Sequence, residues 1–301
     1  AGGAAALIAA PSLARSPGGP APGALVSQVS QAHLRADVAA LAGFATRWSP
    51  GAGFPAVEDW MAGAFARAGA PDKDIHRLPY DLQPNLRRHN ILCGNPRAAR
   101  GIVLVGAHVD SISEDPARLA PGANDNATGV AAMLEIRRIL GPLDLPHELV
   151  CVAFSGEEQE QAGSTALARQ AAREGWRIRL MINLDMLGHH PTHAQTRLVV
   201  EYDQGNARPD NDAEARRWGL RAVELAAEHT RIAVETGDIW GSDYMAFEAE
   251  GYPCVGLYDN GVDAAQYHST SDVPESVDFD RLEQATRLAV ALTAEAAGLR
   301  A

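Results

Sequence analysis

Three short apolar runs constrain the fold of this chain more than any other feature. Residues 102–107, 149–154 and 180–184 are continuous apolar stretches, a pattern typical of strands that are covered on both faces. Residues 127–140 and 163–173, which lie between them, carry apolar side chains at helical spacing. Strands that alternate with helices predict an α/β fold in which one sheet lies between layers of helices.

The same alternation continues over the rest of the 301 residues. We expect further helices at 31–48, 55–69, 211–229, 242–250 and 278–298, and further strands at 90–93, 198–200 and 255–257. A hydrophobic content of 46% is that of a globular protein. We therefore assign residues 28–301 to a single domain and exclude the Ala-, Gly- and Pro-rich residues 1–27 from the fold.

The N-terminal segment and the overall charge bear on location and partners. Residues 4–10 resemble the end of a signal-peptide apolar region, and residues 12–14 offer a small-residue cleavage site, so we expect a secreted or periplasmic bacterial protein. A flexible linker is the alternative for this segment. No stretch is apolar and long enough to span a bilayer, and a net charge of −12 argues against a nucleic-acid partner.

Residues suited to metal binding stand at the ends of the apolar runs. His108 follows the first run, and Asp110 lies two positions further, where an extended chain points both side chains to one face. The carboxylate of Asp110 is therefore placed to accept a hydrogen bond from the ring nitrogen of His108 that does not bind metal. This pair alone is weak evidence, because a surface pair gives the same pattern.

An acidic pair, Glu157 and Glu158, directly follows the run 149–154. Adjacent carboxylates at the end of a buried strand repel each other unless a cation lies between them. Neighbouring side chains point to opposite sides, so one can bind metal while the other faces an attacking water molecule. A solvated acidic loop is the alternative.

Three more candidate ligands lie elsewhere in the chain. Asp125 precedes the helix at 127–140, where it suits either a metal site or a helix cap. Asp185 ends the run 180–184, where a buried carboxylate needs a partner. His268 lies in a polar segment and resembles an ordinary surface histidine. Two histidines and several carboxylates suit a pair of divalent ions.

Each of these motifs is weak evidence alone, but their order along the chain is specific. Along the chain they are His108-Val109-Asp110, Pro121–Gly129, Gly156-Glu157-Glu158, Asn183-Leu184-Asp185-Met186 and Tyr267–Asp272. Over about residues 31–298, this order resembles the M28 family of zinc aminopeptidases, in particular bacterial secreted leucyl-aminopeptidase-like members. The resemblance implies a three-layer zinc-exopeptidase fold, with a mixed, mostly parallel sheet of about eight strands between helices.

The resemblance also implies a set of ligands. Asp125 would bridge two Zn²⁺ ions, for which Co²⁺ or Mn²⁺ could substitute. His108 and Asp185 would complete one site. Glu158 and His268 would complete the other.

The implied reaction is hydrolysis of the N-terminal peptide bond of peptides with a free α-amine. A metal-activated water would attack, Glu157 would be the general base, and Asp110 would orient a ligand. Some members have a tyrosine before the Ser-Asp pair, where this chain has Ile239, so we leave the residue that stabilises the intermediate unassigned.

Alternatives remain open at this stage. A glutaminyl cyclase-like enzyme resembles this family, and nothing strongly excludes another amide or dipeptide hydrolase of the same fold. A non-catalytic binding module is disfavoured because all five ligands and Glu157 are present. The preferred N-terminal residue and the oligomeric state do not follow from the sequence.

Overall fold

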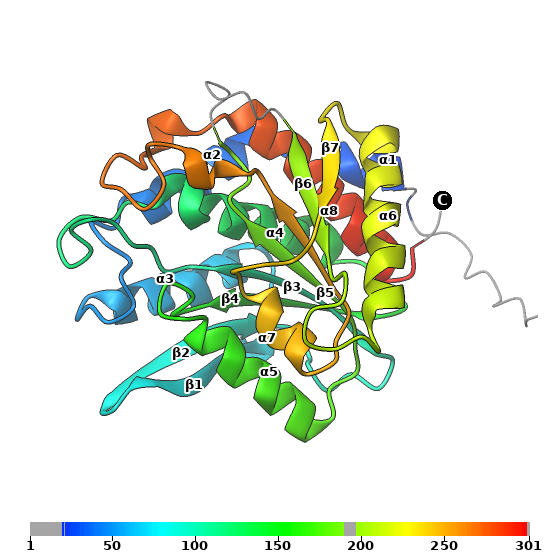
Figure 1. Cartoon of the computed structure of the whole chain (residues 1–301), viewed down its shortest axis with the longest axis horizontal. Helices are drawn as coiled ribbons and strands as arrows, with labels where there is room; N and C mark the ends of the chain where they lie inside the picture. Colours follow the sequence, from blue (N-terminus) through cyan, green and yellow to red (C-terminus); the bar gives the residue numbers. More distant parts are fainter. Residues whose placement is uncertain (1–19, 21, 190–196, 300–301) are drawn as a thin grey trace, which may run out of the picture.

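The computed structural model describes residues 20, 22–189 and 197–299 (Figure 1). The α-helices of this part of the chain are α1 Pro22–Val26, α2 Gln31–Ala42, α3 Phe54–Arg67, α4 Thr128–Leu140, α5 Ala162–Glu174, α6 Asp212–His229, α7 Tyr244–Ala249 and α8 Phe279–Ala296. The strands are β1 Ile75–Gln83, β2 Leu86–Cys93, β3 Ile102–His108, β4 Glu148–Phe154, β5 Ile178–Asp185, β6 Leu198–Tyr202, β7 Val234–Gly237 and β8 Cys254–Tyr258.

The strands form one sheet in the order β1-β2-β4-β3-β5-β8-β6-β7. Four of its seven neighbouring pairs are parallel: β3 with β4, β3 with β5, β5 with β8, and β6 with β7. The other three pairs are antiparallel. The predicted α/β fold with a mixed, mostly parallel sheet between helices is therefore confirmed.

Alternation along β3 shows how the two faces of the sheet are covered. Ile102 and Leu104 pack in a core cluster with residues of α5 and α7. Val103 and Val105 point to the other face and join a larger cluster with residues of the remaining α-helices. Both sets are fully buried, as expected for a central strand that is covered on both sides (Figure 1).

The structure corrects several predicted boundaries. The helix predicted at 31–48 ends at Ala42, because the chain turns inward and buries Arg47. The fold also begins before residue 28, since Leu25 and Val26 of α1 are buried in the core. Strands β1 and β7, which we did not predict, lie at the two edges of the sheet.

The predicted signal-peptide region, residues 4–14, lies outside the described residues. None of the helices in the described part of the chain combines the length and the apolar character needed to cross a membrane.

Candidate metal centre

The parallel strands bring the predicted ligands to one edge of the sheet. His108 is the last residue of β3 and Asp185 is the last residue of β5. Glu157 and Glu158 follow the end of β4, which lies beside β3. Carboxyl ends of neighbouring parallel strands meet at the same edge, so residues far apart in sequence converge there.

Asp125 lies between the two histidines. Its Oδ1 is 3.2 Å from Nε2 of His108, and its Oδ2 is 3.2 Å from Nε2 of His268. Nε2 of His108 is also 3.3 Å from Oδ1 of Asp185, and Nε2 of His268 is 3.2 Å from Oε2 of Glu158. The result is two donor groups that share Asp125, and the donor atoms of each group lie within 4.8 Å of one another.

The pKa values of the two histidines indicate that the donor groups favour positive charge. Burial acts to lower the pKa of His108, but Asp185 and Asp125 outweigh it and raise this pKa well above its usual value. Burial is likewise outweighed at His268, where Asp125 and Glu158 raise the pKa to about 10. The carboxylates around both imidazoles therefore favour positive charge at this position, which a proton or a metal ion can supply.

An unpaired buried oxygen of Glu158 also supports a metal site. Oε1 of Glu158 is buried and has no hydrogen-bond partner among the residues that the structure describes. Burial, followed by the charge of Asp125, raises the pKa of Glu158 to about 7. Nitrogen and carboxylate donors in such an arrangement match the ligands of Zn²⁺, so the residues present fit the two ions that the sequence implies.

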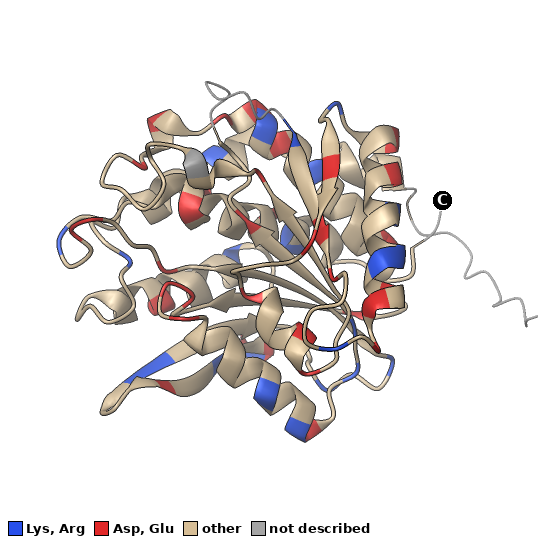
Figure 2. Cartoon of the chain, viewed as in Figure 1, with Lys and Arg blue, Asp and Glu red and all other residues tan. Residues whose placement is uncertain are grey.

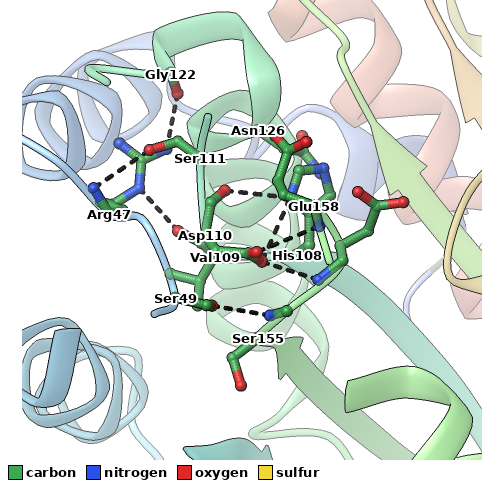
Figure 3. Close-up of polar contacts among 12 residues, drawn as sticks. Arg47, Ser49, His108, Val109, Asp110, Ser111, Gly122, Asn126, Ser155 and Glu158 are labelled. Carbon is green, nitrogen blue, oxygen red and sulfur yellow. Dashed lines mark hydrogen bonds and ion pairs between the residues drawn. The ribbon is translucent and has the colours of Figure 1, made fainter. Parts of the chain in front are cut away.

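Asp110 is buried at the centre but does not act as we predicted from its spacing. Nδ1 of His108 lies 3.2 Å from the backbone carbonyl of Asp110 and 3.8 Å from its Oδ1. The carboxylate instead accepts the backbone N–H groups of Glu157, at 3.2 Å, and Glu158, at 3.3 Å (Figure 3). Asp110 therefore orients the acidic pair with its side chain and His108 with its backbone.

Glu157 lies beside the donor groups and belongs to neither of the two that share Asp125. It is mostly buried, and its Oε1 accepts a hydrogen bond of 3.0 Å from Nε2 of Gln161. Burial raises its pKa well above the usual value, although His108 opposes this. A carboxylate with a raised pKa is a stronger base, which suits proton transfer.

Arg47 is a supporting residue that we missed because it fell within a predicted helix. It is fully buried and donates to the carbonyls of Val109 and Gly122, each at 2.8 Å (Figure 3). A third carbonyl that it contacts is that of Pro121. Arg47 thereby joins the segment that carries Asp110 to the one that leads into Asp125.

Two further side chains, also unassigned from sequence, fix the backbone around Asp125. Asp272 is buried, and its two oxygens accept the N–H groups of Asn124, at 2.8 Å, and Asp125, at 3.0 Å. Oδ1 of Asn126 accepts the N–H groups of Gly129 and Met186. Both residues fall within the quoted motifs, but a buried hydrogen-bond acceptor leaves no periodic signal in a sequence.

A cavity of about 250 Å³ opens beside the donor groups. Within the described part of the chain, its lining includes no Lys or Arg but several carboxylates: Asp125, Glu157, Glu158, Glu160, Asp185 and Glu201. Figure 2 shows Lys and Arg dispersed over many elements of the chain. The cavity is thus a strongly acidic site that favours a cationic ligand.

The model of peptidase family M28 matches residues 90–293. The chain belongs to this family. It is 28% identical to a "probable zinc metalloprotease" of Pyrenophora tritici-repentis, covering 86% of this chain and 70% of the relative. It is 24% identical to a "probable leucine aminopeptidase 1" of Trichophyton verrucosum, and the match covers 91% of this chain and 76% of the relative. Among the zinc metalloproteases that it matches, the chain spans between 52% and 70% of the relative's length.

Solved structures share the fold of this M28 chain. The LapA aminopeptidase of Legionella pneumophila superposes with a TM-score of 0.76 at 15% identity, covering 93% of this chain and 75% of that one. A glutaminyl cyclase of Bacteroides thetaiotaomicron superposes with a TM-score of 0.72 at 18% identity. This match covers 88% of our chain and 98% of the cyclase. The fold therefore hosts both activities, and the side chains of the site must decide between them.

Proposed function

We propose that this M28 peptidase is a two-zinc aminopeptidase that removes the N-terminal residue of peptides with a free α-amine. The observation that carries the proposal is Asp125, whose two oxygens each face a different histidine at 3.2 Å. Two donor groups that share one carboxylate would hold the pair of divalent ions that a two-metal hydrolase uses. Zinc is supported by the donor set and by the names of the relatives.

Each group of residues would have a separate role in peptide-bond hydrolysis. When bound, the ions would polarise the scissile carbonyl and lower the pKa of the attacking water. Glu157 would take the proton from that water and pass it to the leaving amine. Gln161 holds the carboxylate of Glu157, and Asp110 holds its backbone, so the base is oriented before the substrate arrives.

The acidic cavity supports an exopeptidase over an endopeptidase. A volume of about 250 Å³ suits one amino-acid side chain better than a long peptide segment. The surplus of carboxylates favours the positive charge of a free α-amine. Export from a bacterial cell is part of this proposal and rests on residues 4–14 alone.

Metal content and substrate choice together test the function. We expect two zinc ions per chain, cleavage of leucyl-p-nitroanilide, and no cleavage of its N-acetyl derivative, which lacks the amine. Equal cleavage of both anilides would contradict an aminopeptidase. Failure to release the N-terminal residue from any anilide with a free α-amine would contradict it as well.

A glutaminyl cyclase is the second candidate, because an enzyme of that name shares the fold. The group formed by His108, Asp125 and Asp185 argues against a one-ion cyclase, since a complete second donor set is present. Cyclisation of an N-terminal glutamine peptide, with no release of its first residue, would favour the cyclase.

A further inference from the structure

Glu201 is a buried carboxylate in the wall of the cavity that belongs to neither donor group. It lies on β6, in the otherwise apolar and aromatic segment Leu198–Tyr202, and only 3% of its surface is exposed. It nevertheless lines the cavity together with the metal-binding residues. A charged residue in this position requires a physical reason, because an unpaired buried carboxylate is costly.

The neighbouring strand leaves room for this side chain. Gly256 of β8 pairs with Glu201, and a Cβ atom at Gly256 would lie 2.8 Å from Oε2 of Glu201. The same Cβ would lie 2.5 Å from a ring atom of Tyr244. The absence of a side chain at Gly256 therefore lets Glu201 and Tyr244 meet beside the cavity.

Only one oxygen of Glu201 has a partner among the described residues. Oε2 receives a hydrogen bond of 2.7 Å from the hydroxyl of Tyr244. The other oxygen has no donor in the described part of the chain, and no Lys or Arg lines the cavity. Burial, opposed by the hydrogen bond from Tyr244, raises the pKa of Glu201 to about 8.

The distance between β6 and the donor groups suits a substrate with a long side chain. In the sheet, β8 lies between β5, which ends in Asp185, and β6. Two strand spacings place β6 roughly 10 Å from β5. Met186, Tyr258 and Tyr267 add apolar and aromatic surface to the cavity, against which an alkyl stem could pack.

We propose that Glu201 makes the cavity select peptides whose N-terminal residue is lysine or arginine. The α-amine would lie among the donor-group carboxylates, and the cationic side chain would reach the free oxygen of Glu201. This inference rests on the proposed aminopeptidase function and narrows its substrate class. An uncharged side chain of equal length would leave the carboxyl group of Glu201 without its cation.

Lysyl and norleucyl anilides test the proposal, because they differ mainly in the terminal ammonium group. We expect the unaltered chain to prefer the lysyl anilide by at least about tenfold in kcat/KM, the range of a hydrogen bond to a charged group. Comparable kcat/KM for the two would overturn the proposal. This ratio needs no variant, so it holds even if a substitution impairs folding.

Glu201→Gln provides the matched variant, since it keeps the shape and can still accept from Tyr244. We expect it to lose the preference for lysyl and arginyl anilides and to keep its activity on the norleucyl anilide. Glu201→Asp, which keeps the charge, should retain the preference. An equal loss on all substrates would show that Glu201 only supports Tyr244 at the start of α7, and it would overturn the proposal.

Calorimetry separates this inference from the proposed function. Free lysine and free norleucine are the probes, and neither requires turnover. Tighter binding of lysine by the unaltered chain but not by Glu201→Gln would support the pocket assignment even without any hydrolysis, in which case the aminopeptidase proposal alone would fail. Equal binding of both amino acids would overturn the pocket assignment.

Discussion

At the residue scale, Asp125 shows what sequence alone leaves open. From the sequence, its position before a helix was compatible with either a helix cap or a metal ligand. In the first turn of helix α4, which begins at Thr128, the side chain of Asn126 accepts the N–H of Gly129, whereas the carboxylate of Asp125 faces the two histidines. The helix-cap interpretation is therefore wrong, and the carboxylate is free to bind cations.

Asp125→Ala tests the shared position of this residue. Because Asp125 contributes an oxygen to both donor groups, we expect its loss to lower the bound metal by more than one ion per chain. Elemental analysis after gel filtration measures this, with Asp144→Ala, at a fully exposed position, as the control. Full occupancy in Asp125→Ala would contradict a bridging role.

Glu157→Gln tests the general base. Glutamine cannot accept a proton, so kcat should fall by about 10² to 10⁴ while the metal content stays unchanged. Glu148→Gln, at the start of β4 and so at the other edge of the sheet from Glu157, is the control and should keep normal turnover. Normal turnover in Glu157→Gln would remove this residue from the mechanism.

At the element scale, the central strands were predictable and the edges were not. Runs such as 102–107 are apolar on both faces, so their burial is evident from composition. Strand β1 has exposed and half-buried residues with only Tyr80 buried, and it includes Pro79, so its sequence lacks the apolar run of a central strand. The strand ends indicated His108, Glu158 and Asp185, and the resemblance to the M28 family implied Asp125 and His268 as well. Arg47 and Glu201 gave no such signal, because their contacts are with segments distant in sequence.

Gly129→Ala tests the contact between α4 and β5. A Cβ there would lie 2.3 Å from the backbone oxygen of Leu184 and 2.4 Å from Oδ1 of Asn126, so the helix must shift. We expect the free energy of unfolding in urea to fall by about 1–3 kcal/mol.

A matched control is available in α3. At Gly63 the nearest atom to an added Cβ is the flexible end of Arg67, at 3.2 Å. Gly63→Ala should therefore stabilise the chain by about 0.5–1 kcal/mol. Equal effects of the two substitutions would show that α4 does not pack tightly on β5.

At the scale of the whole molecule, buried carboxyl groups couple stability to pH. Burial is the largest cause that raises the pKa of Asp37 to about 6, and those of Asp243, Asp259 and Asp272 to about 7, from 3.8. Their folded forms hold protons more tightly than the unfolded chain does. In the metal-free protein their contribution to stability must therefore fall as the pH rises from about 4 to about 7.

His268 extends this loss to higher pH when metal is absent. Its pKa is raised from 6.5 to about 10, so the stability it contributes is present below pH 6.5 and is lost as the pH rises toward 10. Metal ions reverse the balance at the donor groups, because they bind deprotonated imidazole and carboxylate and bind more tightly as the pH rises. Charge at this centre is thus balanced by protons in acid and by metal near neutrality.

The difference in Tm between zinc-loaded and chelator-treated protein should therefore be larger at pH 8 than at pH 5. Thermal unfolding at both pH values, with and without a chelator, measures this difference, and peptidase activity should decline in acid as the histidines protonate and release metal. Asp125→Ala serves as the control, since it should show little stabilisation by zinc at either pH. An equal Tm difference at pH 5 and pH 8 would mean that zinc binds without displacing protons, which is incompatible with His108 and His268 as its ligands.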